Sequence, residues 1–428
     1  MSTAHDPRAE RRLILAGIAG NVMEWYDFAI YGYFAPVIGQ HFFPSHDPTS
    51  SLIAAFGVFA AGFLMRPLGG LVFGHIGDRV GRKTALTLSV LAMAIPTFLI
   101  GILPGYQYLG AAAPFLLVVL RMIQGLSVGG EYTTSIVFLV EGAAPGRRGL
   151  VGSWSVFGSV GGVLFGSAVG ALVTELLSPA VINSWGWRLP FVVGLVVGLA
   201  GLFIRQHIPE PPRAAEGPAK SPVLEAFRTE WHTMLRIVGV NLLNAVGFYL
   251  SFVYAVSYFQ EIDLVPSAEA LQINTINMTA LLLLVPVAGA LSDRVGPRPL
   301  LLGAAFGVLL LGYPLFWLMH HAHFALMLLG QLGFAILLGV YFGALPVAMV
   351  EAVSARVRCS GLSIAYNLCL GVIGGFTPMV ATYLVAKTED DLSPAYFIMA
   401  AAAVTFVFVW GLRPAAAVLA PADGVELG

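Results

Sequence analysis

GHIGDRVGRK, residues 74–83, recurs as GALSDRVGPR at residues 289–298, 215 positions later in a chain of 428 residues. The acids Glu141 and Glu351 repeat this pattern, because each ends an apolar run and is followed by an arginine-bearing loop. Both separations, from residue 74 to residue 289 and from residue 141 to residue 351, are close to half of the chain length. Repeats of this size form separate structural units, and binding sites commonly lie between them. The sequence therefore predicts two similar halves.

The composition places this chain in a membrane. Hydrophobic residues make up 58% of it and charged residues only 11%, with a mean hydropathy of +0.84. Soluble globular proteins contain about 25% charged residues. The net charge of -1 leaves no basic face that could bind nucleic acid. We therefore expect an integral membrane protein whose partners are the lipid bilayer and a small molecule.

Apolar runs of about 20 residues are long enough to cross a bilayer as helices. The sequence predicts twelve of them, at residues 16–39, 50–75, 84–103, 112–141, 149–173, 187–206, 233–259, 270–291, 299–319, 323–350, 360–386 and 394–412. A proline-rich, charged stretch at residues 208–230 cannot span. We expect an all-α membrane protein with a six-helix bundle at residues 1–207, a linker at 208–230 and a second six-helix bundle at 231–428.

The distribution of basic residues predicts the orientation. Of the 22 Lys and Arg, all but Arg66, Arg121, Arg188 and Lys387 fall at the N-terminus, the even-to-odd loops, the linker or the C-terminal end. Loops rich in Lys and Arg remain on the cytoplasmic side. Both termini and the linker are therefore expected in the cytoplasm, whereas Arg66 and Arg121 lie inside predicted spans.

Five motifs resemble one known family. They are GHIGDRVGRK, already quoted, GNVMEWYDFAIYG at residues 20–32, RMIQGLSVGG at 121–130, WGWRLPF at 185–191 and VRCSGLSIAYN at 357–367. Their order is similar to that of the metabolite:proton symporters of the major facilitator superfamily, which include bacterial uptake systems for citrate, 2-oxoglutarate, shikimate, and proline or glycine betaine. The resemblance implies a bacterial inner-membrane carrier with no cofactor except the coupling protons and no metal. A monomer is expected, since one chain holds the whole cavity.

Two acids in the first apolar run are candidates for proton coupling. Glu24 and Asp27 lie roughly 60° apart on one helical face, and two carboxylates that close in a low dielectric should not both ionise. Glu131 lies beside the face of its own helix that carries Arg121 and is a third candidate. The alternative is that Glu24 and Asp27 statically neutralise the two membrane arginines.

The candidates for substrate binding are the two arginines and a set of aromatic and amide side chains. An arginine within hydrocarbon needs a carboxylate, a carbonyl or water, which makes Arg66 and Arg121 suitable for a carboxylate substrate. Aromatic faces can hold a quaternary ammonium, although most aromatic residues in membrane helices only pack. The remaining candidates are Trp25, Tyr31, Tyr249, Asn244 and Asn367.

The repeated loop is predicted to act as a conformational latch. An acid at a helix end can contact the N-terminus of the next helix, and the loop arginines can pair with an acid such as Glu141. The latch residues are Gly74, Asp78, Arg79, Gly81, Arg82, Glu141, Asp293 and Arg294. A basic loop that only sets topology would explain the arginines but not the repeated aspartate.

The expected function is proton-coupled import of a small carboxylate-bearing metabolite by alternating access. An organic acid such as citrate or 2-oxoglutarate should depend on both arginines, whereas proline or betaine should need one arginine and an aromatic cage. The chain stops at Gly428 without the charged heptad tail of some osmolyte carriers, which tilts the expectation toward an organic acid. A metabolite sensor that does not transport is the rival of another class, and no nucleophile, metal or nucleotide motif supports an enzyme.

Overall fold

The computed structural model describes residues 7–44, 48–206 and 221–412. Within these ranges the chain is helical, and ten helices are long and apolar enough to cross a membrane. The segment Gly186–Ala200 is a shorter apolar helix, and the second predicted span is present as two consecutive helices. These segments confirm the predicted all-α, twelve-helix membrane architecture.

The first half contains α1 to α9. Their bounds are α1 Pro7–Phe42, α2 Pro48–Leu64, α3 Arg66–Arg79, α4 Arg82–Ile102, α5 Tyr106–Leu109, α6 Ala112–Gly142, α7 Arg148–Leu176, α8 Pro179–Ser184, the 3-10 turn η1 Gly186–Arg188 and α9 Leu189–Gln206. The helix predicted at residues 50–75 is broken at Met65, because Pro67 occupies the first turn of α3, where proline is tolerated, whereas it disrupts a helix interior.

The second half contains α10 to α18. Their bounds are α10 Pro222–Thr229, α11 Trp231–Phe248, the π-helical segment η2 Tyr249–Tyr254, α12 Ala255–Glu261, α13 Ser267–Val295, α14 Pro297–Met319, α15 Phe324–Ala352, α16 Arg358–Leu368, the π-helical segment η3 Cys369–Gly374, α17 Gly375–Thr388 and α18 Ser393–Trp410. The predicted linker lies outside the described residues up to residue 220, and its last part forms α10.

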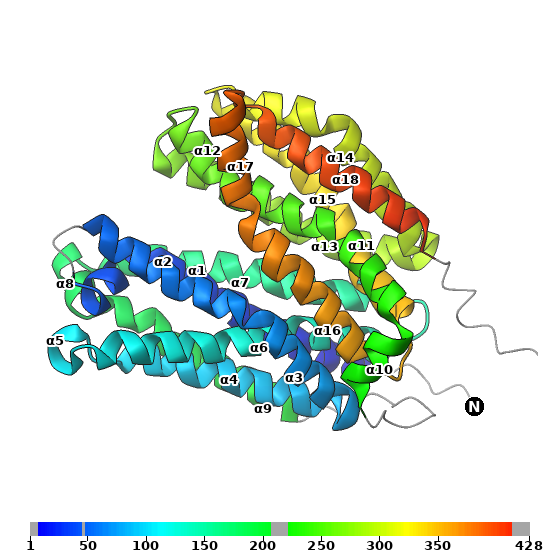
Figure 1. Ribbon diagram of the computed structural model, residues 1–428, viewed down its shortest axis with the longest axis horizontal. Helices are drawn as coiled ribbons and strands as arrows, with labels where there is room; N and C mark the ends of the chain where they lie inside the picture. Colours follow the sequence, from blue (N-terminus) through cyan, green and yellow to red (C-terminus); the bar gives the residue numbers. More distant parts are fainter. Residues whose placement is uncertain (1–6, 45–47, 207–220, 413–428) are drawn as a thin grey trace, which may run out of the picture.

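The two halves form separate bundles that meet at one end (Figure 1). They converge where α3, α10 and α16 lie and diverge toward α5, α8 and α12; we call these the closed end and the open end. Contacts between the halves are made chiefly by α7 with α13 and by α3 with α16. The α3–α16 contact is backbone to backbone, since a Cβ on Gly74 would lie 2.9 Å from the Ser360 Cα.

The glycine between the two helices of the repeated motif has a positive φ in both halves. Gly81, between α3 and α4, has φ 143°, and Gly296, between α13 and α14, has φ 82°. L-residues with a side chain rarely adopt such positive φ values. The glycine of each motif copy therefore permits the tight turn that joins two antiparallel helices.

Candidate functional site

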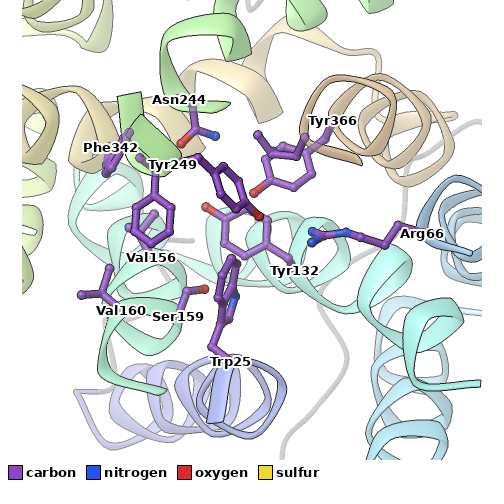
Figure 2. A pocket seen from close by; sticks show the side chains of 12 residues that line it. Trp25, Arg66, Tyr132, Val156, Ser159, Val160, Asn244, Tyr249, Phe342 and Tyr366 are labelled. Carbon is purple, nitrogen blue, oxygen red and sulfur yellow. The ribbon is translucent and has the colours of Figure 1, made fainter. Parts of the chain in front are cut away.

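A cavity between the bundles gathers side chains from both halves. Its empty volume is about 500 Å³, including the part open to solvent. The lining residues are Trp25, Arg66, Tyr132, Val156, Ser159 and Val160 from the first half, and Asn244, Phe248, Tyr249, Phe342, Tyr366 and Leu370 from the second. Of the predicted substrate-binding residues, Arg66, Trp25, Tyr249 and Asn244 therefore meet in one place (Figure 2).

Half of the residues that line the cavity are aromatic. Tyr132 and Tyr366 stack across the two halves with ring centroids 4.8 Å apart. Trp25 contacts Phe248 edge to face at 6.0 Å, again from one half to the other. Aromatic faces carry negative electrostatic potential and attract cations. The wall is therefore suited to an apolar or cationic group.

Arg66 is the one charged side chain among the described residues that line the cavity. It begins α3 at the break in the second span, and it is 1% exposed. Figure 2 shows it reaching toward the cluster of Tyr132, Tyr249 and Tyr366, and the Tyr249 hydroxyl accepts a hydrogen bond from it. Its Nε has no hydrogen-bond partner in the described part of the chain. A buried guanidinium with a free donor can bind a carboxylate.

Glu24, on α1, lies within electrostatic range of this arginine. Its side chain is 0% exposed, and neither carboxyl oxygen has a hydrogen-bond partner among the described residues. The charges of Arg66 and Glu131 both act on it electrostatically. A buried carboxylate without hydrogen bonds is unfavourable, so the neutral, protonated form is favoured unless a cation compensates.

Asp27, one turn further along α1, has a full set of partners. Its carboxylate pairs with Arg121 at 2.5 Å. It also accepts hydrogen bonds from Thr97 and Gln124, both at 2.8 Å. The Arg121 guanidinium in turn lies 4.0 Å from the centre of the Tyr31 ring. Asp27 and Arg121 thus form a closed, buried ion pair between α1, α4 and α6.

The other predicted site residues lie around the cavity rather than in its lining. Glu131 accepts a hydrogen bond from the Ser89 hydroxyl. Tyr31 packs on Arg121 and donates to the Ala55 carbonyl at 3.0 Å. Asn367 donates to the Gly129 carbonyl at 2.5 Å and so joins α16 to α6.

At the closed end, each repeated aspartate binds the N-terminus of a helix in the opposite half. Asp78 accepts hydrogen bonds from the backbone N–H groups of Cys359 at 3.0 Å and Ser360 at 2.8 Å, in the first turn of α16. Asp293 accepts from the N–H groups of Gly149 at 2.6 Å and Leu150 at 2.8 Å, in the first turn of α7. Helix N-termini favour such anions. The partner is therefore not the next helix along the chain, as the sequence had suggested, but one across the interface.

Glu141 extends this contact. It pairs with Arg82 of its own half at 3.1 Å and with Arg358 of the other half at 2.8 Å. The corresponding ion pair of the second repeat is longer, since Arg148 lies 3.8 Å from Glu351. Gly74 and Gly81 provide the close approach and the turn, whereas Arg79 and Arg294 are exposed. The predicted latch residues thus gather at the closed end.

At the open end, three loops of the second half are tied together. The His320 ring lies 3.2 Å from the Asp263 carboxylate and 3.0 Å from the Tyr258 hydroxyl, which donates to the Asp391 carbonyl at 3.1 Å. Burial raises the pKa of Asp263 to about 6, and the neighbouring His320 opposes part of that rise.

Several site residues were not predicted. Tyr132 follows Arg121 by eleven residues and so shares its helical face, a signal that was available. Phe342 is one of 28 phenylalanines and carried no distinguishing pattern. Gln124 and Arg358 gain their roles only through partners that lie far away in the sequence.

Comparisons with known proteins identify the family and agree with the fold. The family model described as "Sugar (and other) transporter" matches residues 13–215 and again residues 214–417. The "Glycine betaine/proline/ectoine/pipecolic acid transporter" of Dickeya dadantii is 35% identical over 92% of this chain and 81% of that protein. The "Citrate-proton symporter" of Klebsiella pneumoniae is 34% identical over 91% of this chain and 88% of that protein. The solved proton:xylose symporter bound to 6-bromo-6-deoxy-D-glucose has a TM-score of 0.82, at 17% identity, over 96% of this chain and 97% of that one.

Proposed function

Because the chain belongs to the sugar (and other) transporter family, and within the major facilitator superfamily to its metabolite:proton symporters, we propose that it imports a small zwitterion of the proline or betaine type together with protons. The observation that carries this proposal is the cavity itself. It offers one arginine for one carboxylate, and an aromatic wall for a substituted ammonium group.

The two ends of such a substrate match the two kinds of wall. A carboxylate can accept charge-assisted hydrogen bonds from Arg66. The ammonium group would then lie against the rings of Trp25, Tyr132 and Tyr366, which supply cation–π attraction of about 0.5–2 kcal/mol. The relative in Dickeya dadantii, named for substrates of this chemistry, supports the same choice.

An organic di- or tricarboxylate is the second candidate, supported by the relative named a citrate–proton symporter. It would need a further cation for each further carboxylate. Arg121, the other membrane arginine, is bound to Asp27, and recruiting it would leave a buried aspartate unpaired. Such a step costs several kcal/mol, which favours the zwitterion.

Glu24 is proposed as the proton carrier. When the cavity is empty, the charge of Arg66 favours an ionised Glu24, against the burial that favours its neutral form. When a substrate carboxylate occupies Arg66, Glu24 loses that compensation and takes up a proton, because a buried carboxylate without a partner favours its neutral form. One arginine shared by two carboxylates thus couples substrate binding to protonation.

Transport would follow from opening the closed end. The closed end carries the basic loops of the chain, so by the positive-inside rule it faces the cytoplasm of a bacterial inner membrane, with both termini on that side. The open end then faces outward. Release of the substrate inward requires the Asp78, Asp293 and Glu141 contacts to break and the bundles to rock.

Uptake into proteoliposomes tests the proposal. Labelled proline, glycine betaine, citrate, 2-oxoglutarate and shikimate are offered with and without an inward proton gradient. We expect proline or betaine to accumulate above equilibrium only with the gradient. Accumulation of citrate alone would favour the organic-acid candidate, and binding without accumulation would support a sensor.

A further inference from the structure

Asn244 is the one amide side chain among the described residues that line the cavity. It lies in α11, one turn before the π-helical segment η2, and Figure 2 shows its amide pointing into the cavity beside Tyr249. It donates one hydrogen bond from Nδ2 to the Asn241 Oδ1 at 3.0 Å. In the described part of the chain, nothing donates to its own Oδ1.

The orientation of this amide is fixed by the residue behind it. Asn241 is 0% exposed and donates from Nδ2 to the Ile237 carbonyl at 2.9 Å. A carbonyl oxygen can only accept, so the amide nitrogen of Asn241 must face it. The amide oxygen of Asn241 therefore faces Asn244, and Asn244 donates to it from its own amide nitrogen. Because this hydrogen bond uses the nitrogen of Asn244, its oxygen is left to face the cavity as a hydrogen-bond acceptor.

We propose that Asn244 determines specificity, by favouring substrates whose ammonium group still bears a hydrogen over those with a quaternary ammonium. The proposal rests on the proposed function, because it concerns the ammonium end of the same zwitterion. An N–H of the substrate would donate to the Asn244 oxygen while the carboxylate binds Arg66. Asn241 is then a positioning residue, since it acts only through Asn244.

Two attractions compete in this cavity. Each methyl group added to the ammonium improves its contact with the aromatic wall, which favours a quaternary ligand. Removal of the last N–H leaves the Asn244 oxygen without a donor in a buried site, and a hydrogen bond to a charged group is stronger than an aromatic contact. We therefore expect the hydrogen bond to decide the preference.

A ligand series on the unaltered protein tests this inference. Proline carries two N–H bonds, N-methylproline one and N,N-dimethylproline none, with the same ring and carboxylate. Competition against labelled proline uptake should give similar affinities for the first two and an affinity about tenfold weaker for the third. Equal or rising affinity along the series would overturn the proposal.

Two variants test whether the Asn244 oxygen causes the difference in affinity between proline and N,N-dimethylproline. Asn244→Leu keeps a similar side-chain size but removes the acceptor, and should bring the ratio of proline to N,N-dimethylproline affinity close to one. Asn241→Leu removes the group that orients the amide and should lower the same ratio part of the way. Asn183→Leu, the same change at an exposed position of α8, is the matched control and should keep the full ratio. An unchanged ratio in Asn244→Leu would contradict the assignment.

The experiment distinguishes this inference from the proposed function. If proline and N,N-dimethylproline are both taken up with equal affinity, the role of Asn244 is wrong while the zwitterion proposal stands. If neither competes and citrate is transported instead, both are wrong.

Discussion

The two acids of the first helix differ in what surrounds them. Asp27 is held by Arg121, Thr97 and Gln124. Glu24, in contrast, has no hydrogen bond in the described part of the chain and is influenced by the charge of the cavity arginine. An acid that exchanges a proton in each cycle cannot be locked in a permanent ion pair. We therefore assign proton transfer to Glu24 and a structural role to Asp27.

Replacing Glu24 by Gln should separate transport from proton coupling. The amide mimics the protonated acid, so Glu24→Gln is expected to exchange labelled proline across the membrane but not to accumulate it against a gradient. Counterflow and gradient-driven uptake in proteoliposomes measure the two activities. Full gradient-driven accumulation in the variant would remove Glu24 from the mechanism.

The Asp27–Arg121 pair gives a prediction about stability. Removing one partner of a buried ion pair costs about 3–5 kcal/mol, because the other charge is left uncompensated. Asp27→Asn and Arg121→Gln should each lower the apparent Tm, and the double variant should be more stable than either. Thermal unfolding of the purified protein in detergent measures this. Additive losses in the double variant would show that the two residues do not act as a pair.

For single residues, the sequence identified the charged side chains in the membrane helices but not which of them pair. Glu24, Asp27, Arg66 and Arg121 were conspicuous because charges are rare in membrane helices. Their pairing depends on how α1, α4 and α6 rotate against each other, and helical periodicity within one segment does not determine that. Of the two pairs in the alternative, Asp27 with Arg121 is present as an ion pair, whereas within the described ranges Glu24 and Arg66 share no hydrogen bond.

Among the secondary-structure elements, we propose that the helix N-termini at the closed end control its opening. Asp78 of α3 binds the start of α16, and Asp293 of α13 binds the start of α7. The two contacts are related by the repeat and cross the interface in opposite directions. Both must break together when the bundles separate at this end.

Cys359 offers a native reporter of this opening. Its thiol is buried behind Asp78, and Cys369 is the only other cysteine. In a Cys369→Ala background, Asp78→Asn should speed thiol labelling of Cys359 about fivefold, since a carboxylate at a helix N-terminus contributes about 1 kcal/mol.

Asp293→Asn should speed the labelling of Cys359 as well, although it lies at the other contact, because the bundles open as units. Asp391→Asn, at the open end, serves as the control and should leave the rate unchanged. No acceleration in either closed-end variant would argue against the latch.

The loops at the open end should give a pH-dependent stability. The pKa of Asp263 is raised from 3.8 to about 6 by burial, so the folded state binds this proton more tightly than the unfolded state. Its contribution to stability therefore falls as the pH rises from 3.8 to about 6. Apparent Tm values measured across this range should show a smaller decline in Asp263→Asn than in the unaltered protein. An identical decline would assign it to other groups.

Apolar run length predicted the spans but not their interruptions. The run at residues 50–75 reads as one helix, yet it breaks at Met65 and so sets Arg66 at the start of α3. Pro67 was a visible signal for that break. The π-helical segment η2 contains no proline or glycine, whereas η3 contains Gly371 and Gly374. In the fold, η2 packs against α17 and η3 against α11.

The whole molecule is arranged as a transporter of two bundles that meet at the closed end and separate toward the open end (Figure 1). The repeat, the hydropathy and the motifs predicted this architecture, because each records a constraint that acts on the entire chain. The substrate was harder to predict, since it depends on which of many aromatic and polar side chains reach one cavity. The proposed preference for a zwitterion over an organic acid rests on the assembled site and on the relative named for such substrates.

The central claim is that substrate binding at Arg66 drives protonation of Glu24. Its most direct test is proton uptake driven by the substrate, with a pH-sensitive dye inside proteoliposomes and no imposed gradient. Addition of external proline should acidify the interior for the unaltered protein, whereas Glu24→Gln should admit labelled proline without acidification. Equal acidification by both proteins, or proline entry into the unaltered protein without any acidification, would contradict the account.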